Sequence, residues 1–545
     1  MALPYSLRRF WSALDTDLRV FLLGYLVLLP FFWAPLVFTK YLPGLDLGFH
    51  LSTADLLSKG VGPDSPYHGF YSIKNLWAPY SAHYLALVAI GKLVGGIALA
   101  HNVVVCLYVA ALPATLAAFL SACGKSRIPA LLAFPLAYNL CLHYGFISFC
   151  LSLPALFALF ATLCHLLRRP TFSWTSWSAS AASGVLLFFC HLQNLLFGLC
   201  GAAVLLTFTR APWRRRALAL ASLGPTLASL LYWHLQTSFK GDPNEQKKTL
   251  AFAWQAVKAA RVVDFLGGKR PLSLDLRERL EHVPEMALKG FTDLSDVAGA
   301  KALLFALAAY VVMGLLALLL PRGARPRPRF GLATVFLALG ALFAFLALPH
   351  HLWAFELMTF FPRFSVLLLL LLIPLVPAGL RRLPWHSALL ALAPALVLGV
   401  LYGKLVNTKY HAYRDEIRDF ITVLNKVPRD GKLMGIIFDR KSTVMRIESA
   451  LVSLPAFYVA VHPDARTMVP VHYCGMRHMP CAVEKTVPWP GPWMGNAFNW
   501  DETHALFDYY LVQHATPSAG LLGPLVSRVQ PMAGAGKWAL FRKGQ

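Results

Sequence analysis

Charged residues are scarce in this chain. They make up 14% of its 545 residues, whereas hydrophobic residues make up 57% and the mean hydropathy is +0.56. Soluble globular domains carry about 25% charged residues, so this composition excludes an ordinary water-soluble protein. Acidic residues are the scarcer charged class, because 26 Asp and Glu stand against 50 Lys and Arg, which gives a formal net charge of +24.

The positive excess does not indicate nucleic-acid binding. Much of it lies in short segments between apolar stretches, where membrane orientation and anionic lipid headgroups account for it. The chain also lacks an internal repeat and a small-residue cleavage site after its first apolar stretch. Without such a site the first stretch does not resemble a removable secretory signal, so we expect it to stay attached.

Long apolar stretches recur from Leu18 to Tyr402. A membrane-spanning helix needs about 20 apolar residues, and we interpret eleven stretches as spans. The predicted fold class is an all-α polytopic membrane protein of about 11 transmembrane helices, followed by a small α/β domain. The predicted spans are about 18–39, 99–121, 127–142, 146–167, 177–192, 194–209, 216–235, 301–320, 330–349, 363–379 and 386–402.

Clusters of Arg and Lys fall at every second junction between these spans. Cytoplasmic loops collect such residues, so all six clusters predict one orientation, with a cytoplasmic N-terminus. The clusters are Arg8, Arg9 and Arg19; Lys125 and Arg127; Arg168 and Arg169; Arg210, Arg214, Arg215 and Arg216; Arg322, Arg325, Arg327 and Arg329; and Arg381 with Arg382.

Three outer segments are too long to be turns, and long loops are usually functional. They are residues 40–98, residues 236–300 and the C-terminal region. We therefore divide the chain into a transmembrane domain, residues 1–402, with two exported loops, and an extracytoplasmic domain, residues 403–545. The Ala-, Leu-, Arg- and Pro-rich composition favours a bacterial inner membrane.

Periodicity predicts further elements in these outer segments. Residues 84–98 are expected to form an interfacial helix, and residues 51–59 and 250–266 are similarly amphipathic. The C-terminal region is expected to begin with a helix at 410–427 and to contain strands, because β-rich runs follow the turn after Pro428. The predicted strands are 432–438, 509–512 and 538–542.

Nine cysteines are present, and seven of them lie in or beside the predicted spans as small buried hydrophobes. Cys474 and Cys481 lie close together in the predicted exported domain. Oxidising conditions there favour a disulfide. Unpaired thiols, or a zinc site that also uses His472 and His478, are the alternatives, although the spacing matches no standard zinc module.

Asp46 follows the first span closely, and His50 comes one helical turn later. A helix starting here places both on one face. A carboxylate at the membrane boundary is costly unless it is used, and Asp46 is suited to act as general base, with His50 orienting it or sharing a metal. The alternative is that Asp46 only caps the following helix.

Other polar residues gather at the outer ends of the spans and suggest a polar cavity open to the outer face. Arg363 is the most informative, because the positive-inside rule disfavours a cation there and a guanidinium binds phosphate in a bidentate manner. Anchoring at the headgroups is the alternative for Arg363. The candidate substrate-binding residues are Arg363, His191, His350, Lys269 and Arg270.

Residues 1 to about 300 resemble the GT-C glycosyltransferases, which include protein mannosyltransferases, oligosaccharyltransferase catalytic subunits and bacterial aminoarabinose transferases. The resemblance is one of layout: an acidic residue just beyond the first span, interfacial helices in the first loop, seven spans and a second large exported loop. Leu45-Asp46-Leu47-Gly48-Phe49-His50 is the motif-like piece.

The resemblance implies inverting transfer of a sugar from a polyprenyl-phosphate-linked donor to an envelope acceptor on the outer side. It implies that Asp46 is the base, that residues such as Arg363 hold the donor phosphate, and that Asp46 and His50 would be ligands if a divalent metal is used. Many members carry paired acidic residues in this loop, whereas here only Asp55 and Asp64 follow Asp46, at a distance.

Two other classes of function compete with a glycosyltransferase. A lipid or solute transporter would place ionisable groups near the bilayer midplane and often shows inverted repeats, neither of which is evident. A non-catalytic envelope scaffold would keep a transferase-like membrane part and bind a protein through its exported domain. The single Asp46, without a second acidic residue beside it, is the feature that favours the scaffold.

Overall fold

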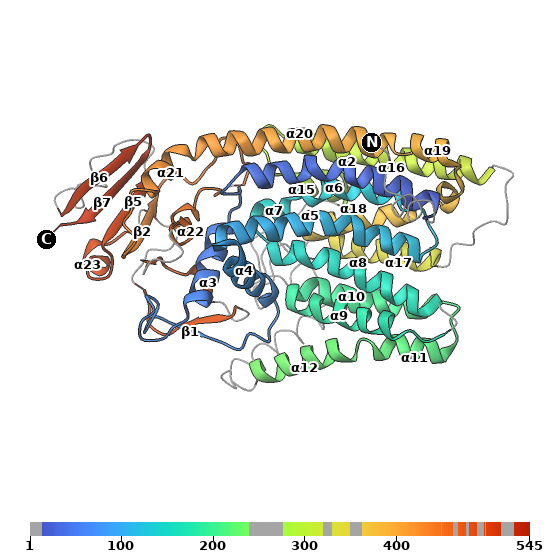
Figure 1. Ribbon diagram of the computed structural model, residues 1–545, viewed down its shortest axis with the longest axis horizontal. Helices are drawn as coiled ribbons and strands as arrows, with labels where there is room; N and C mark the ends of the chain where they lie inside the picture. Colours follow the sequence, from blue (N-terminus) through green and yellow to red (C-terminus); the bar gives the residue numbers. More distant parts are fainter. Residues whose placement is uncertain are drawn as a thin grey trace, which may run out of the picture.

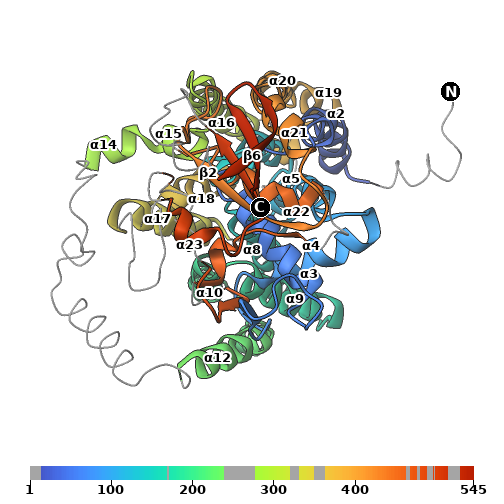
Figure 2. The same ribbon diagram turned by 90° about the vertical axis from the view of Figure 1, so that its left-hand side faces the viewer.

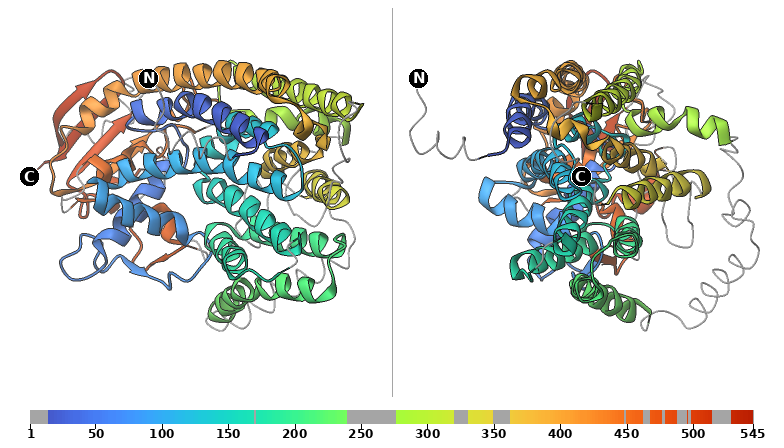
Figure 3. Two further views of the ribbon diagram at one scale, coloured as in Figure 1. Left: turned by 45° about the vertical axis from the view of Figure 1, so that its right-hand side comes forward. Right: turned by 90° about the vertical axis from the view of Figure 1, so that its right-hand side faces the viewer.

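The computed structural model places most of the chain in helices and describes residues 14–168, 171–238, 276–319, 330–348, 362–447, 449–461, 467–475, 479–487, 495, 498–513 and 528–544. Figure 1 shows a bundle of long helices aligned with the long axis, with a β-sheet at one end and α11 and α19 at the other. Figure 2 views the bundle from the sheet end, and Figure 3 views the opposite end.

Most helices of the bundle lie within or near the predicted spans, whereas residues 276–288 form two short helices in the predicted second exported loop. In chain order the helices are α2 (Thr16–Phe38), α5 (Ile97–Ala122), α6 (Ala133–Ala137), α7 (Leu140–Tyr144), α8 (Ile147–Arg168), α9 (Trp174–Cys190), α10 (Leu192–Thr207), α11 (Trp213–Ala221), α12 (Gly224–Ser238), α14 (Leu276–Glu281), α15 (Val283–Leu288), α16 (Ser295–Leu319), α17 (Gly331–Ala347), α18 (Pro362–Leu372), α19 (Trp385–Leu390) and α20 (Ala393–Glu416).

Five helical segments in the described part of the chain are long and apolar enough to cross a membrane: α2, α5, α8, α16 and the combined α19 and α20. A sixth is obtained if α11 and α12, which are bent by 42°, count as one span. These segments support a multi-pass membrane protein. The count of eleven stays a prediction, because the other predicted spans correspond to shorter or broken helices.

Glycines let α2 and α20 approach closely. A Cβ atom at Gly399 would lie 2.6 Å from a Leu28 side-chain carbon, and one at Gly403 would lie 2.9 Å from Cβ of Phe31. Small residues at such positions allow close helix packing in membranes. The two helices therefore run side by side along the bundle (Figure 1).

The first loop folds into two short helices, α3 (Leu47–Lys59) and α4 (Ser81–Val94). The predicted helix at 84–98 is separate from the next span, as expected, but it ends earlier. Gly95 and Gly96 have φ values of 82° and 150° and divide α4 from α5. Glycine adopts such backbone angles without steric cost, so the chain can turn sharply here.

The last long helix continues beyond the predicted domain boundary at Tyr402. Tyr402, Val406, Tyr410 and Tyr413 recur at helical spacing and are all buried, which keeps one face of α20 packed as far as Glu416. A shorter helix, α21 (Arg418–Leu424), follows. The prediction that a separate helix begins at residue 410 is therefore wrong. The sequence becomes less hydrophobic after Tyr402, but α20 continues through this change.

The C-terminal region contains a five-stranded mixed sheet in the order β3-β2-β5-β7-β6. The predicted strands correspond to β2 (Gly431–Ile437), β5 (Tyr509–Gln513) and β7 (Trp538–Lys543), which confirms them. Strand β2 pairs in parallel with β3 (Thr467–Met468) and β5, whereas β7 pairs antiparallel with β5 and β6 (Val529–Ala535).

The C-terminal region packs directly on the first loop. Strand β4 (Cys481–Val483) pairs antiparallel with β1 (Tyr71–Ile73), and the Gly48 amide donates to the Ser453 hydroxyl at 3.2 Å. A Cβ atom at Gly48 would overlap the Ser453 carbonyl oxygen. Short elements around this contact are η5 (Leu454–Phe457), α22 (Tyr458–Val461) and η6 (His472–Gly475), and α23 (Trp500–Thr503) precedes β5 in the chain.

Replacing Gly48 with Ala should loosen this junction. Because the added methyl group would meet backbone rather than a flexible side chain, we expect a loss of about 1–3 kcal/mol of folding free energy. The thermal unfolding temperature in detergent should fall relative to wild type. Gly62→Ala, at a position with open space, is the control, and an equal fall in both variants would contradict the proposed contact.

Candidate functional site

Asp46 lies at the sheet end of the bundle, in the residue just before α3. Its backbone amide donates to the Tyr144 carbonyl at 3.1 Å, and the amide of Leu45 donates to the His143 carbonyl at 3.1 Å. These bonds fix the loop to the end of α7. The Asp46 side chain forms no capping bond to α3, so the capping alternative is not supported.

Gly145 leaves room for Asp46. It has a φ of 87°, and a Cβ atom there would lie 3.0 Å from both the Cβ and the amide nitrogen of Asp46. The left-handed backbone and this close approach both require glycine. The short turn between α7 and α8 thus sets the position of the Asp46 carboxyl group.

Burial dominates the chemistry of Asp46. The residue is 8% exposed, and desolvation raises the pKa of its carboxyl group to about 7, although the Tyr473 hydroxyl donates a hydrogen bond and the Arg363 charge lies nearby, both of which lower it. A general base works best when its pKa is near the operating pH. Asp46 is therefore a carboxylate that can hold a proton at neutral pH.

His50 lies one turn along α3 and contacts tyrosine rather than the carboxylate. Its Nδ1 is 2.8 Å from the Tyr84 hydroxyl, and its ring also hydrogen-bonds to the backbone of Gly145. Desolvation lowers the pKa of His50 to about 4, so the ring is neutral at pH 7. The helix thus brings His50 to the site, and its ring positions Tyr84.

Two more histidines extend this aromatic cluster. The His83 ring centroid lies 5.2 Å from that of His50 and 5.8 Å from that of His101, and all three are buried. Within the described ranges, no three His, Cys, Asp or Glu side chains are arranged to hold a metal ion. Metal ligation by Asp46 and His50 stays a prediction.

Arg363 and His191 are in direct contact. They are 172 residues apart in sequence, yet Arg363 Nη1 lies 2.8 Å from His191 Nε2. Because a guanidinium can only donate, Nε2 must be unprotonated, and His191 is neutral. The guanidinium carbon also lies 4.2 Å from the centre of the Phe146 ring, in a cation–π contact. Arg363 is thus held near Asp46 by neutral and aromatic partners.

A disulfide supports the far side of the site. Cys474 and Cys481 are bonded, which confirms the disulfide interpretation against unpaired thiols and zinc. Tyr473, beside Cys474, contacts Asp46, and Met479 accepts a hydrogen bond from Tyr84 at 3.4 Å. The bridged segment therefore places two of its side chains against Asp46 and the His50 cluster.

The structure brings together four of the seven site residues predicted from sequence: Asp46, His50, His191 and Arg363. His350, Lys269 and Arg270 lie outside the described residues, as does the amphipathic segment 250–266. The cavity bordered by Leu47 and His101 measures about 10 Å³ and does not test the predicted open cavity. The open cavity also stays a prediction.

Sequence reasoning missed the tyrosines. Tyr473 and Tyr84 contact the two predicted catalytic residues, and the Tyr80 ring packs 4.8 Å from His191. The available signal in the sequence was that Tyr473 directly precedes Cys474, one of the two cysteines in the predicted exported domain. Asp55 is no second carboxylate of this site, because it binds the Tyr67 hydroxyl at 2.7 Å and Lys59 at 2.9 Å.

Tyr473→Phe should change the pH dependence of any reaction that needs ionised Asp46. Activity is expected to fall as the pH drops below about 7, because the carboxyl group is then protonated. Removing the Tyr473 hydroxyl removes a bond to the charged form and raises the pKa further, so the acid limb should move upward by roughly half to one pH unit.

Activity at a pH well above this limb should be retained in Tyr473→Phe, which separates a pKa effect from simple misfolding. Tyr67→Phe is the matched control, since Tyr67 donates to Asp55 instead of Asp46. The measurement is the pH profile of the initial rate. An unchanged profile in Tyr473→Phe, or an equal movement in the control, would contradict the assignment.

Comparison with solved structures shows that the fold of this chain is similar to a known one. No family model matches the chain, and no curated protein sequence matches it. The ArnT structure from Cupriavidus metallidurans in the apo state is similar over 95% of this chain and 97% of that chain, at 13% identity and a TM-score of 0.53. The structure of the same protein bound to undecaprenyl phosphate covers the same shares at 13% identity, with a TM-score of 0.54.

The arabinofuranosyltransferase AftD from Mycobacteria is also similar, over 100% of this chain and 40% of that chain, at 13% identity and a TM-score of 0.47. The fold assignment rests on the two ArnT structures, whose whole length is matched. This chain therefore has the fold of the two ArnT structures, in agreement with the layout inferred from its sequence.

Proposed function

We propose that this protein transfers a sugar from a polyprenyl-phosphate-linked donor to an envelope acceptor on the extracytoplasmic side of a bacterial inner membrane. The observation that carries the proposal is the buried Asp46 carboxyl group, with its pKa near 7, beside the buried Arg363 guanidinium. One group accepts protons and the other binds anions. Transfer of a sugar from a lipid phosphate needs both.

In the proposed reaction the acceptor hydroxyl oxygen attacks the anomeric carbon of the donor sugar. Its proton passes to the Asp46 carboxylate as the new C–O bond forms, and the bond between the anomeric carbon and the phosphate oxygen breaks on the opposite face. The anomeric carbon is thereby inverted. The products are the glycosylated acceptor, polyprenyl phosphate and protonated Asp46, which returns the proton to solvent.

Arg363 would bind the donor phosphate and stabilise the negative charge that develops on it as the bond breaks. A guanidinium suits this role, because its planar fork can donate two parallel hydrogen bonds to phosphate. His191 is neutral and accepts a hydrogen bond from Arg363 Nη1. It therefore fixes the orientation of the guanidinium without neutralising its charge. The similar ArnT structure, which holds undecaprenyl phosphate, supports a polyprenyl phosphate as the donor class.

Two observations support the proposed orientation. Described members of the basic clusters lie at the bundle end opposite the sheet: Arg127 binds Asp15 at the start of α2, and Arg168 binds the carbonyls that end α5. The positive-inside rule assigns that end to the cytoplasm. The disulfide at the other end fits an oxidising compartment.

The proposal is tested with the purified full chain, a polyprenyl phosphate carrying a radiolabelled sugar, and an extract of envelope glycan or lipid acceptors. Product should form in detergent, where no membrane separates two compartments. If the protein instead moves labelled lipid across proteoliposome membranes and forms no product, it is a transporter. If it does neither and its C-terminal region retains a specific envelope protein, it is a scaffold.

A further inference from the structure

A pocket lined by several polar residues lies at the end of the bundle opposite Asp46. It has a volume of about 720 Å³ and is bordered by the last turns of α5 and α8, the first turn of α9 and the segment η4 (Ala378–Arg382). Ligand sites commonly measure about 300–1,000 Å³. The pocket has no part in the proposed sugar transfer, so it needs its own explanation.

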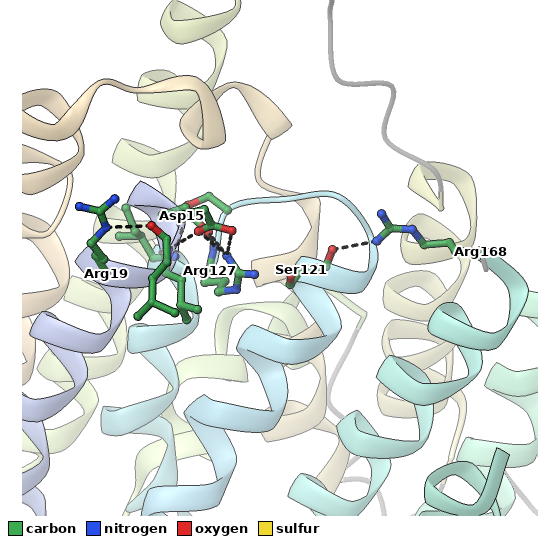
Figure 4. A network of polar contacts seen from close by, with 10 residues as sticks. Asp15, Arg19, Ser121, Arg127 and Arg168 are labelled. Carbon is green, nitrogen blue, oxygen red and sulfur yellow. Dashed lines mark hydrogen bonds and ion pairs between the residues drawn. The ribbon is translucent and has the colours of Figure 1, made fainter. Parts of the chain in front are cut away.

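Three arginines line this pocket: Arg127, Arg168 and Arg381. Arg127 lies 3.0 Å from both Asp15 and Asp17, and Arg168 donates to the Ser121 and Ala122 carbonyls at 3.1 and 2.7 Å (Figure 4). Neighbouring groups thus hold both guanidinium groups in place. Three cations against the two carboxylates leave the pocket with a positive excess.

Arg381 differs from the other two arginines. Its side chain is exposed, and it makes no hydrogen bond to any residue that the structure describes. An exposed guanidinium that lines the same pocket as two fixed guanidinium groups can donate to a bound anion there.

The first turn of α9 adds a second anion-binding feature. Thr175 and Ser176 line the pocket, and α9 begins at Trp174, so the amino-terminal end of a 17-residue helix borders it, with the Ser176 amide donating to the Ser173 hydroxyl. Helix N-termini favour negative charge. Part of the lining is apolar, since Ala118, Ala122 and Ala161 also border the space. The pocket thus combines anion-binding groups with an apolar wall.

The position of the pocket along the bundle is that expected for a site at the membrane surface. Gly145, beside Asp46, and His165, in the pocket wall, are 20 residues apart across α8, which is about 30 Å, or one hydrocarbon thickness. At the start of α9, Trp174 is 70% exposed, and its ring packs against Phe172 and Trp177. Such aromatic belts lie at the level of lipid headgroups.

We propose that this pocket binds the phosphate of an anionic phospholipid of the inner leaflet, with its glycerol and upper acyl chains against the alanine wall. The lipid joins α5, α8 and α9 at their cytoplasmic ends. This inference rests on the proposed orientation but not on the proposed sugar transfer, because the pocket lies at the opposite end of the bundle and no residue around Asp46 lines it.

The test is a titration of the delipidated full chain in detergent with phosphatidylglycerol, followed by native mass spectrometry to count bound lipids. Phosphatidylcholine and inorganic phosphate are titrated separately. The variant is Arg381→Ala, whose exposed side chain makes no hydrogen bond to a described residue, although its charge acts on Asp15. Arg214→Ala is the matched control, since Arg214 is an exposed arginine on α11 that does not border the pocket.

We expect one phosphatidylglycerol to bind wild type and Arg214→Ala with equal affinity. In Arg381→Ala the affinity should fall roughly tenfold, as expected for the loss of one charge-assisted hydrogen bond. Equal binding of phosphatidylcholine, or equal losses in both variants, would overturn the proposal. Saturable binding of inorganic phosphate that displaces the lipid with equal affinity would assign the pocket to a free anion instead.

Discussion

Asp46→Asn is expected to lower the rate of sugar transfer by about 100-fold or more, the range found when a general base is removed. Asparagine keeps the shape of the side chain but cannot accept the acceptor proton. The backbone bonds that fix this loop to Tyr144 and His143 do not involve the side chain, so the fold should survive. The measurement is the initial rate with saturating labelled donor.

Asp64→Asn provides the matched control for this variant. Asp64 lies in the same loop, is exposed, and makes no ion pair or hydrogen bond within the described part of the chain. Its rate should equal that of wild type. A rate for Asp46→Asn within a few fold of wild type would remove the proposed base, whatever the fold of the protein.

Arg363→Ala is expected to lower kcat/KM for the lipid-linked donor by about 100- to 1,000-fold. Losses of this size occur when a positioned group that stabilises charge in the transition state is removed. The guanidinium is buried and lies 2.8 Å from His191 Nε2. Arg363→Lys should recover part of the loss, because lysine restores the charge without the planar fork. Rates over a range of donor concentrations separate KM from kcat.

Arg277→Ala is the control for charge alone, since Arg277 is 84% exposed and paired only with Glu281 in the described structure. It should leave kcat/KM unchanged. The elution profile of Arg363→Ala on size-exclusion chromatography must match that of wild type, so that misfolding does not imitate a binding defect. A correctly folded Arg363→Ala with unaltered kcat/KM would contradict the phosphate role.

Local patterns were sufficient to predict much of the scaffold. Apolar stretches located the helices of the bundle, because burial in lipid demands a long apolar run wherever the chain crosses. Alternation and β-rich composition located β2, β5 and β7. Strand β6 was missed, because Pro531 and Gly534 lower its strand propensity and it lies at the sheet edge, where such residues are tolerated.

The candidate site could be predicted only in part. Asp46 was identified because a carboxylate beside a span is costly, which is a local signal. The contact between Arg363 and His191, and that between Asp46 and Tyr473, join residues far apart in sequence. No periodicity encodes such contacts, since they depend on how α10, α18 and the disulfide-bridged segment pack in space.

The same packing explains why the C-terminal region matters to the proposed reaction. Tyr473 contacts Asp46, Met479 contacts Tyr84, and β4 pairs with β1 of the first loop. The C-terminal region therefore helps to enclose the Asp46 carboxyl group, and burial of that group raises its pKa. A protein-binding role for the C-terminal region is compatible with both the scaffold and the transferase hypotheses. The two hypotheses are therefore distinguished by whether Asp46 acts as a base.

The most direct test is a structure of the full chain with undecaprenyl phosphate bound. Density for the phosphate should lie against the Arg363 guanidinium, with the Asp46 carboxyl group facing the same space, at the end of the bundle that carries the sheet. Phosphate density at another place, with Arg363 still resting on His191 and Asp46 still enclosed by Tyr473, would contradict the proposed site.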